Sequence, residues 1–239
     1  MKCVICQNES VIVIKTIFFC ETCFQNKFFQ KIRRVLKNLK DKNVLLVLSG
    51  SRDSLVLAYF IDKIFLNRKN TKIHLFCPEF NRFIDFFENL CFQKINFQIP
   101  KISNENEDYF CTNYIRRLLS MLNENIEGSE KIRSVIIEEN LNESAAILFD
   151  FICNGKGRDA CNYARGQIDD LIFIKPLSDI FNYEIDHYYL SLKNIVPLSA
   201  IQIKRSNIYE MSANFIDSLT KDNYSTPYNI IETLKKVPK

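Results

Sequence analysis

The sequence has no tryptophan, only five glycines, six prolines and two histidines. So little glycine and proline excludes a collagen-like or low-complexity chain. The histidines, His74 and His187, have no companion ligand or acid in the sequence, so we interpret them as core or surface residues rather than catalytic ones. No apolar run reaches the length of a membrane span, because Lys15, Asp62 and Lys63 interrupt the longest candidates. The first ten residues lack the apolar segment of a secretion signal, so we expect a soluble, cytoplasmic protein without a membrane-bound part.

The charge of the chain is concentrated near its start. The 239 residues are 47% hydrophobic and 25% charged, as in an ordinary globular protein with one sizeable domain and room for a small appendage. Residues 1–40 hold eight Lys/Arg against two Glu, which gives +6, whereas the rest of the chain carries −2. A basic cluster suits a polyanion such as nucleic acid, because neutralised phosphates release counterions. A solvated face of an amphipathic helix is the alternative interpretation.

Four of the nine cysteines form a spaced pattern: Cys3-x2-Cys6, thirteen further residues, then Cys20-x2-Cys23. In a chain without a secretion signal, two C-x2-C pairs indicate a metal site before disulfides. Two knuckles would make a tetrahedral four-sulfur cage, and the β-branched and aromatic segment between them predicts the strand pair of a zinc ribbon. We predict structural zinc, with an iron site of rubredoxin type or redox thiols as alternatives. The five cysteines at positions 77, 91, 111, 153 and 161 are unpaired in the sequence, and most of them are interpreted as buried thiols.

Apolar periodicity predicts alternating strands and helices along the rest of the chain. A basic amphipathic helix follows Cys23, with Lys27, Lys31, Arg34 and Lys37 largely outside its apolar stripe. Strands are predicted at 43–50, 72–77, 95–100, 133–140 and 170–177, with helices between them, a glycine-rich bend at 154–158 and helices over 178–190 and 195–239. This alternation predicts an α/β fold with a doubly wound parallel sheet. The predicted units are a zinc ribbon with basic helix at 1–40, an α/β domain at 41–190 and a helical extension at 191–239.

The loop after the first strand of this sheet is the place for a phosphate. In open parallel sheets, ligands bind at the carboxyl ends of strands, where a helix N-terminus supplies N–H groups. The loop reads LSGSRDS and lacks both the G-K-[ST] of a Walker A loop and the third glycine of a dinucleotide fingerprint. Its candidate nucleotide-binding residues are Ser49, Gly50, Ser51, Asp53 and Ser54. A plain N-cap is the alternative role for Asp53 and Ser54.

This loop resembles the S-G-G-x-D-S loop of the PP-loop ATP pyrophosphatases, in which the loop wraps the pyrophosphate of ATP. The resemblance implies ATP as a ligand and a reaction that adenylates a carbonyl oxygen. Ser51 stands in place of the second glycine, which argues against close approach of the backbone to a phosphate, because only glycine tolerates such contacts freely.

The order of motifs resembles the cytosolic tRNA wobble-uridine 2-thiolation family, which has a catalytic subunit and a paralogous partner. The catalytic C-T-x-C-G-x-x-R-R motif aligns with residues 111–117, where Tyr114 replaces the second cysteine that would accompany Cys111. The catalytic G-H-N-x-D-D motif aligns with residues 138–143, which read EENLNE and lack the histidine and both aspartates. The elements GKGR at 155–158 and IKPLSDIFNYEIDHYY at 174–189 are similar to those of the partner, the cytoplasmic tRNA 2-thiolation protein 2 family.

The resemblance implies a non-catalytic subunit of a heterodimer with a catalytic paralogue. The complex would thiolate the wobble uridine of tRNAs for Lys, Glu and Gln, with sulfur from a thiocarboxylated ubiquitin-related modifier that reaches this chain only indirectly. Within this chain, tRNA would be bound by basic residues of the predicted helix: Lys27, Lys31, Arg33, Arg34 and Lys37.

Two other functions stay open at the sequence level. The chain itself could be an active ATP-dependent tRNA sulfurtransferase, with Cys111 and either Cys153 or Cys161 carrying sulfur and Asp53 organising Mg-ATP. A zinc-ribbon interaction module on a degenerate nucleotide-binding scaffold, without any tRNA role, is the other. Salt-dependent tRNA binding separates that module from the thiolation subunit, and ATP–pyrophosphate exchange separates the subunit from the enzyme.

Overall fold

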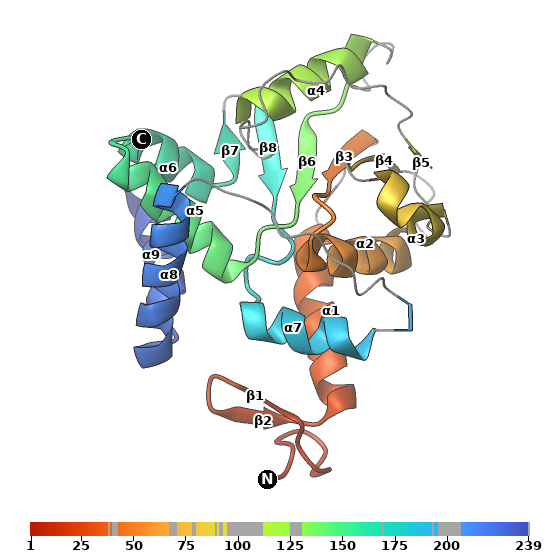
Figure 1. The fold of residues 1–239 in the computed structure, drawn as a ribbon, viewed down its shortest axis with the longest axis vertical. Helices are drawn as coiled ribbons and strands as arrows, with labels where there is room; N and C mark the ends of the chain where they lie inside the picture. The colour runs from red at the N-terminus through yellow and green to blue at the C-terminus, as the bar shows by residue number, and fades with distance from the viewer. Residues whose placement is uncertain are drawn as a thin grey trace.

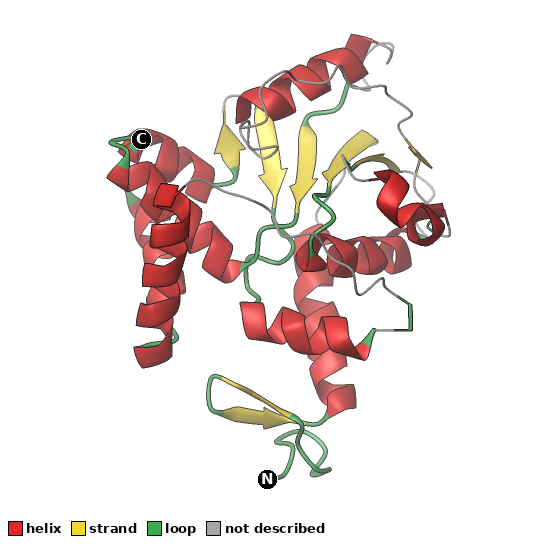
Figure 2. Ribbon diagram, viewed as in Figure 1, coloured by secondary structure: helices red, strands yellow, loops and turns green. Residues whose placement is uncertain are grey.

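The fold is a computed structural model that describes residues 1–37, 39, 43–66, 71–77, 80–88, 90, 93–94, 112–124, 131–168, 170–192, 194–195 and 207–238. A small two-stranded sheet at the N-terminus lies at one end of the molecule, and a six-stranded sheet with helices on both faces forms the rest (Figures 1 and 2).

The large sheet has the strand order β5-β4-β3-β6-β8-β7. Its strands are β3 (Asn43–Val47), β4 (Lys72–Phe76), β5 (Gln93–Lys94), β6 (Ser134–Ile137), β7 (Gln167–Ile168) and β8 (Leu171–Ile174). All neighbours pair in parallel except β7 and β8, which are antiparallel. The order reverses between β3 and β6, because the chain builds outward from β3 first to one side and then to the other. The predicted doubly wound parallel sheet is confirmed.

The helices are α1 (Glu21–Leu36), α2 (Arg52–Phe65), the 3-10 helix η1 (Phe80–Phe83), α3 (Ile84–Glu88), α4 (Thr112–Glu124), α5 (Leu141–Cys153), α6 (Gly157–Ala164), α7 (Asn182–Ser191), α8 (Asn207–Asp222) and α9 (Thr226–Lys236). Side chains of β3 alternate between two cores. Val44 and Leu46 pack with α1, α2, α3 and α7, whereas Leu45 and Val47 pack with α4, α5, α6 and α9. Burial of both faces explains why this strand reads as a continuous apolar run.

The small sheet is a hairpin of β1 (Ile12–Ile14) and β2 (Ile17–Phe19). Its two loop residues, Lys15 and Thr16, have φ angles of 51° and 82°. Positive φ at both positions is the geometry of a type I′ turn, which matches the twist of a hairpin. Ile12, Ile14 and Phe19 are buried in the same core as α1, so the hairpin packs on the helix that follows it.

Several helices and strands differ from the predicted ones. The bend at 154–158 is shorter than predicted, because α6 begins at Gly157 and the short strand β7 follows it. Gly155, with φ of 71°, provides the reversal that separates α5 from α6. The predicted helix after β4 is a 3-10 turn and a five-residue helix ending at Glu88. The predicted strand at 95–100 lies outside the described residues. Among the described helices, none is long and apolar enough to cross a membrane.

Candidate functional site

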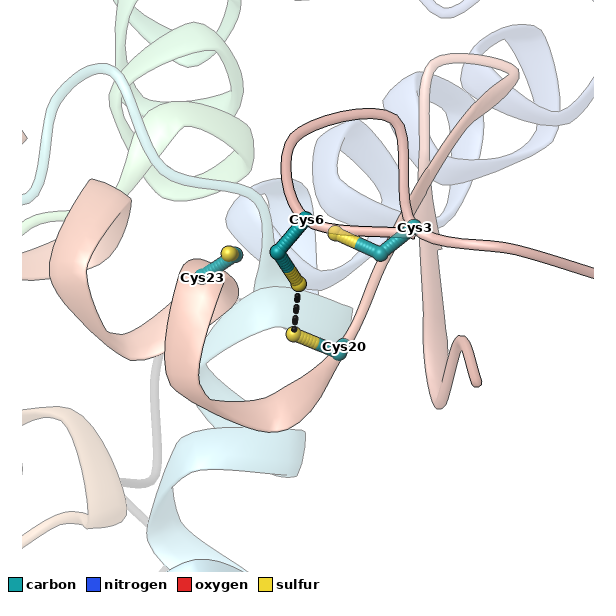
Figure 3. Close-up of side chains that lie close together, drawn as sticks. All are labelled: Cys3, Cys6, Cys20 and Cys23. Atoms are coloured by element: carbon teal, nitrogen blue, oxygen red, sulfur yellow. Dashed lines mark hydrogen bonds between the residues drawn. The ribbon is translucent and has the colours of Figure 1, made fainter. Parts of the chain in front are cut away.

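The four N-terminal cysteines converge on one point (Figure 3). Their sulfur atoms all lie within 4.8 Å of one another, and the Sγ atoms of Cys6 and Cys20 are 3.3 Å apart. Cys3 and Cys20 are buried, Cys23 is half-buried and Cys6 is exposed. The predicted four-cysteine site therefore forms, and it is the only group of side chains in the described part of the chain that could hold a metal ion.

Local backbone structure places each pair of cysteines. The first pair sits on a tight knuckle, in which the N–H of Cys3 donates to Asn8 O and the N–H of Gln7 donates to Cys3 O. Gln7 closes this knuckle with a φ of 63°. The second pair spans the start of α1, because Cys20 is its N-cap residue and Cys23 lies in its first turn. A strand pair and a helix start thus bring together residues that are fourteen positions apart.

The spacing of the sulfur atoms fits a single metal ion. Four thiolates bound at about 2.3 Å around one tetrahedral zinc ion lie about 3.8 Å from one another. Burial raises the pKa of Cys3, but hydrogen bonds from the backbone of Cys20, Cys6 and Ile5 outweigh it and lower that pKa to about 6. Burial and hydrogen bonds with the other three cysteines instead raise the pKa of Cys23 to about 12, and the pKa of Cys6 is also raised. A bound metal ion would deprotonate all four cysteines, because the thiolate is the form that ligates metal. If all four cysteines ligated one zinc ion, no coordination position would stay open, which is the arrangement of structural rather than catalytic zinc sites.

The serine loop, Ser49 to Ser54, follows β3 at the carboxyl edge of the large sheet, and α2 begins within it. Gly50 has a φ of 88°, which is the conformation that glycine adopts freely. Ser51 is the N-cap residue of α2, and its Oγ accepts a hydrogen bond from the N–H of Ser54 at 3.2 Å. The candidate loop residues therefore do gather at a helix N-terminus, as the sequence predicts.

Glu138, which the sequence analysis did not propose as a site residue, lies against this loop. It follows β6, the neighbour of β3, and its carboxylate accepts three hydrogen bonds from the loop. The Ser49 N–H donates to Oε2 at 2.9 Å, the Ser51 hydroxyl donates to Oε1 at 2.7 Å, and the Ser49 hydroxyl also donates to Oε1. The sequence does contain a signal for this residue, because Glu138 directly follows the apolar residues of a predicted strand. Parallel strands end at the same edge of a sheet, so a side chain at the end of one strand can reach the loop that follows its neighbour.

Glu138 is only 2% exposed. Burial raises the pKa of its carboxyl to about 7, the hydrogen bonds from Ser49 and Ser51 oppose the rise, and the nearby charge of Asp53 adds to it. A carboxyl in this position titrates near neutral pH, far above the ordinary range of glutamate.

Asp53 is held on both sides by neighbours in the fold. The Arg52 Nε donates to its Oδ1 at 2.9 Å, and the Asn140 side chain donates to its Oδ2 at 2.6 Å. Arg52 also forms an ion pair with Asp186 of α7. Asn140 in turn caps α5 by accepting from the N–H of Glu143. Asp53 therefore links the starts of two helices, and the sequence analysis did not foresee these partners.

Glu139 takes part in a separate buried cluster. It pairs with Lys175 at 2.9 Å and accepts hydrogen bonds from Tyr163 and Ser144. Burial lowers the pKa of Lys175, and the charge of Glu139 opposes that change. The Lys175 ammonium also lies 3.4 Å from the centre of the Tyr163 ring. The two adjacent glutamates thus serve different clusters, one at the serine loop and one against β8 and α6.

The basic residues of α1 divide into two groups. Lys31 is turned inward, where its ammonium lies 2.9 Å from Glu184 Oε2 and 2.9 Å from Asp179 O. Arg34 is 70% exposed and pairs with Asp179, whereas Arg33 and Lys37 are exposed. Lys27 lies over the ring of Phe19, 4.5 Å from its centre. The outward group is the part of the predicted tRNA-binding set that solvent reaches, and Lys31 ties α1 to α7.

The remaining candidates have varied surroundings. His187 has an acidic partner that the sequence did not reveal, because its Nε2 lies 2.8 Å from Glu21 Oε2. His74 contacts Asn43 across neighbouring strands. Cys161 is buried and Cys153 is exposed, while Cys111 lies outside the described residues.

Comparisons with known proteins place this fold. The solved structure of U34-tRNA thiolase NcsA from Methanococcus maripaludis with its 4Fe-4S cluster matches with a TM-score of 0.77 and 21% identity, over 99% of this chain and 87% of that chain. The fold is that of the PP-loop ATP pyrophosphatases. An NH3-dependent NAD synthetase from Campylobacter jejuni in complex with nitrate gives a TM-score of 0.43 and 20% identity, over 90% of this chain and 91% of that chain.

A curated protein matches at the level of sequence as well. The tRNA-5-methyluridine(54) 2-sulfurtransferase of Pyrococcus horikoshii is 33% identical over 81 residues, which are 31% of this chain and 26% of that protein. The match thus spans about a quarter of the length of that relative. No protein-family model matches the chain.

Proposed function

We propose that this chain is the non-catalytic subunit of a cytoplasmic tRNA-thiolation complex, which forms a heterodimer with a catalytic paralogue. The complex 2-thiolates the wobble uridine of tRNAs for Lys, Glu and Gln, with sulfur from a thiocarboxylated ubiquitin-related modifier. Two of the three similar proteins named above are described as a tRNA thiolase and a tRNA sulfurtransferase, which supports the substrate class. The subunit role rests on the serine loop.

The observation that carries this proposal is the contact between the serine loop and Glu138. An active PP-loop enzyme needs its loop donors for the phosphates of ATP, and here three of them donate to a carboxylate of the same chain. Asp53, the residue that would help to organise Mg-ATP, is engaged by Arg52 and Asn140. Chemistry would therefore fall to the partner subunit.

For the four-cysteine site we propose structural zinc. Sulfur atoms within 4.8 Å of one another suit four thiolates on one ion, whereas thiolates that bind the four separate irons of a cluster stand further apart. Residues Cys3, Cys6, Cys20 and Cys23 would all be ligands. The ion would fix the hairpin on α1 and thereby set the position of the outward basic group.

For tRNA we propose a surface made by the exposed basic residues at the end of α1, Arg33, Arg34 and its C-cap residue Lys37, together with the half-buried Lys27. Their contacts would be with phosphates, which position an RNA without reading its sequence. Lys31 contributes to this surface indirectly, by holding α1 against α7 through Glu184.

The decisive experiment is thiolation of tRNA by this chain alone and by a mixture with a catalytic paralogue, each supplied with ATP and a thiocarboxylated donor. We expect activity only in the mixture. Activity of the chain alone would contradict the subunit role and support the sulfurtransferase interpretation. An inactive mixture in which the two chains do not associate and tRNA does not bind would leave the interaction module as the better description.

A further inference from the structure

The serine loop occupies the position where an open parallel sheet binds an anion. It connects the carboxyl end of β3 to the N-terminus of α2, and β3 is the strand at which the order of the sheet reverses. At such a position, backbone N–H groups and the helix dipole favour a negatively charged ligand. The question is what satisfies these donors in this chain.

The chain itself satisfies them. The Ser49 N–H donates to Glu138, the Gly50 N–H donates to Ser54 Oγ at 3.0 Å, and the Ser51 N–H donates to Ser49 Oγ at 3.0 Å. The Ser54 N–H donates to the Ser51 hydroxyl, so four backbone donors of the loop have partners within the protein. A phosphate entering here would have to displace these bonds.

Two of the three loop hydroxyl groups donate hydrogen bonds to the same carboxylate oxygen. Ser54 donates to Ser51 O, while the hydroxyls of both Ser49 and Ser51 donate to Glu138 Oε1. Two side chains of this arrangement, Ser51 in the loop and Glu138 at the end of β6, stand at positions where the two motifs aligned above have glycine. Each of these side chains adds atoms that glycine lacks, and the Ser51 hydroxyl donates a hydrogen bond to Glu138 Oε1 at 2.7 Å.

We propose that Glu138 is an internal ligand of the serine loop, whose carboxylate takes the place of a phosphate group. The loop is consequently closed to the phosphates of nucleotides in the native chain. The proposed non-catalytic role draws on the same contact between Glu138 and the loop, whereas a role in tRNA thiolation as such does not depend on it.

The test replaces Glu138 and offers the missing anion from solution. We expect Glu138→Ala to bind inorganic pyrophosphate, and ATP with Mg²⁺, at least tenfold more tightly than the native chain in titration calorimetry. Pyrophosphate should raise the melting temperature of Glu138→Ala and leave that of the native chain unchanged, because a ligand stabilises only a state that binds it. Glu210→Ala, which alters an exposed glutamate on α8, is the matched control and should behave like the native chain.

Equal affinity of the native chain and Glu138→Ala for pyrophosphate would overturn the proposal, as would a folded Glu138→Ala that gains no binding. A measurement on the native chain covers the case in which the variant does not fold. Hydrogen exchange of residues 48–55 should be slow without nucleotide and should not change when ATP and Mg²⁺ are added. Protection that appears only with ATP would show that the loop still accepts a nucleotide, and would refute the internal ligand.

Discussion

The cysteine site and the serine loop are two small clusters that sequence motifs predict equally clearly. They differ in what occupies the space between their polar groups. In the first, four sulfur atoms gather within 4.8 Å. In the second, backbone and hydroxyl donors gather, and Glu138 from the neighbouring strand accepts three of their hydrogen bonds. One cluster is arranged to take a ligand from outside, whereas the other contains its own.

The difference follows from the chemistry of the groups. Thiolates repel one another and have no protons to donate to each other, so four of them need a cation to be stable together. Hydroxyl and N–H donors need only acceptors, and a carboxylate of the same chain meets that need at no cost in binding entropy. Motif spacing therefore indicates where side chains meet, but the occupant depends on which neighbour the tertiary structure supplies.

The largest expected effect separates the cysteine site from the rest of the fold. Replacing Cys3 and Cys6 together by Ser should remove the metal and unfold the hairpin, because binding of structural zinc contributes about 10–16 kcal/mol to the folding of such small units. Metal content by elemental analysis and hydrogen exchange by mass spectrometry measure both effects. Helix α1 should remain folded, because Phe24, Phe28 and Ile32 are buried in the main core.

Cys153→Ser is the control for this experiment, since Cys153 is an exposed cysteine outside the cluster. It should keep a full complement of metal. One metal ion per chain in the Cys3/Cys6 variant would refute the ribbon. Loss of α1 together with the hairpin would support the unit at residues 1–40, whereas survival of α1 would place the boundary close to Cys20.

The next-largest effect tests the ion pair that connects α1 to α7. Lys31→Met should destabilise the chain by about 3 kcal/mol, because it leaves the Glu184 carboxylate buried without its cation. Glu184 is 1% exposed, and its ion pair with Lys31 is one of the contacts that hold α1 on α7, together with the contact between Glu21 and His187. Urea denaturation measures the loss. Arg33→Met, at an exposed position of the same helix, should change stability by less than about 0.5 kcal/mol, and an equal loss in both variants would contradict the division of α1 into inward and outward groups.

The pH dependence of stability tests the serine loop directly. Glu138 has a pKa of about 7 in the folded chain against an ordinary value of 4.5, so the folded state binds the proton more tightly. Its contribution to stability is therefore complete below about pH 4.5 and is lost as pH rises through 7, in total about 3 kcal/mol. The negative charge of Asp53 contributes to the raised pKa of Glu138.

Glu138→Gln should remove this dependence. Measured by urea denaturation between pH 4.5 and pH 8, the native chain should lose about 3 kcal/mol relative to Glu138→Gln. The control Glu210→Gln should follow the native chain over the whole range. Parallel curves for the native chain and Glu138→Gln would mean that Glu138 does not titrate in the folded loop, and the contrast with the cysteine site would lose its electrostatic basis.

The smallest effect concerns the outer face of α1. Charge reversal at Arg33 and Lys37 should weaken tRNA binding about tenfold at moderate salt. It should also make the slope of the logarithm of the binding constant against the logarithm of the salt concentration shallower by about 1–2, because fewer phosphate contacts release fewer counterions. Filter binding at several salt concentrations measures both quantities. Glu210→Lys on α8 is a control for net charge, and unchanged binding by the α1 variant would move the RNA surface away from this helix.

The sequence was a good guide to the fold because the pattern was strong in particular places. The apolar run at 43–47 has to be buried on both faces of a strand. The four-residue spacing of Phe24, Phe28, Ile32 and Leu36 places them on one face only if the segment is a helix. Helix α6 escaped prediction since Gly155 and Gly157 suggested a continuous bend, whereas only Gly155 needs a positive φ. Tertiary packing of Ala160 and Cys161 then supports a helix whose start is unfavourable.

The candidate sites were predictable to different degrees. The four cysteines are determined by spacing within 23 residues, which a knuckle and a helix start bring together without help from the rest of the chain. Lys31 could not be recognised as an inward residue, because its partners Asp179 and Glu184 lie about 150 positions away. The acidic partner of His187 was hidden for the same reason, since Glu21 is 166 positions distant.

The sequence by itself therefore determined the alternation of strands and helices in the large sheet, the meeting of the four cysteines and the location of the serine loop, because each of these depends on residues close together in the chain. Only the tertiary structure decided what lies in the loop. Parallel pairing of β3 and β6 carries Glu138 to Ser49 across 89 positions of the chain. The outcome is set by two strand ends that share one edge of the sheet, where a buried carboxylate and a set of hydrogen-bond donors satisfy each other.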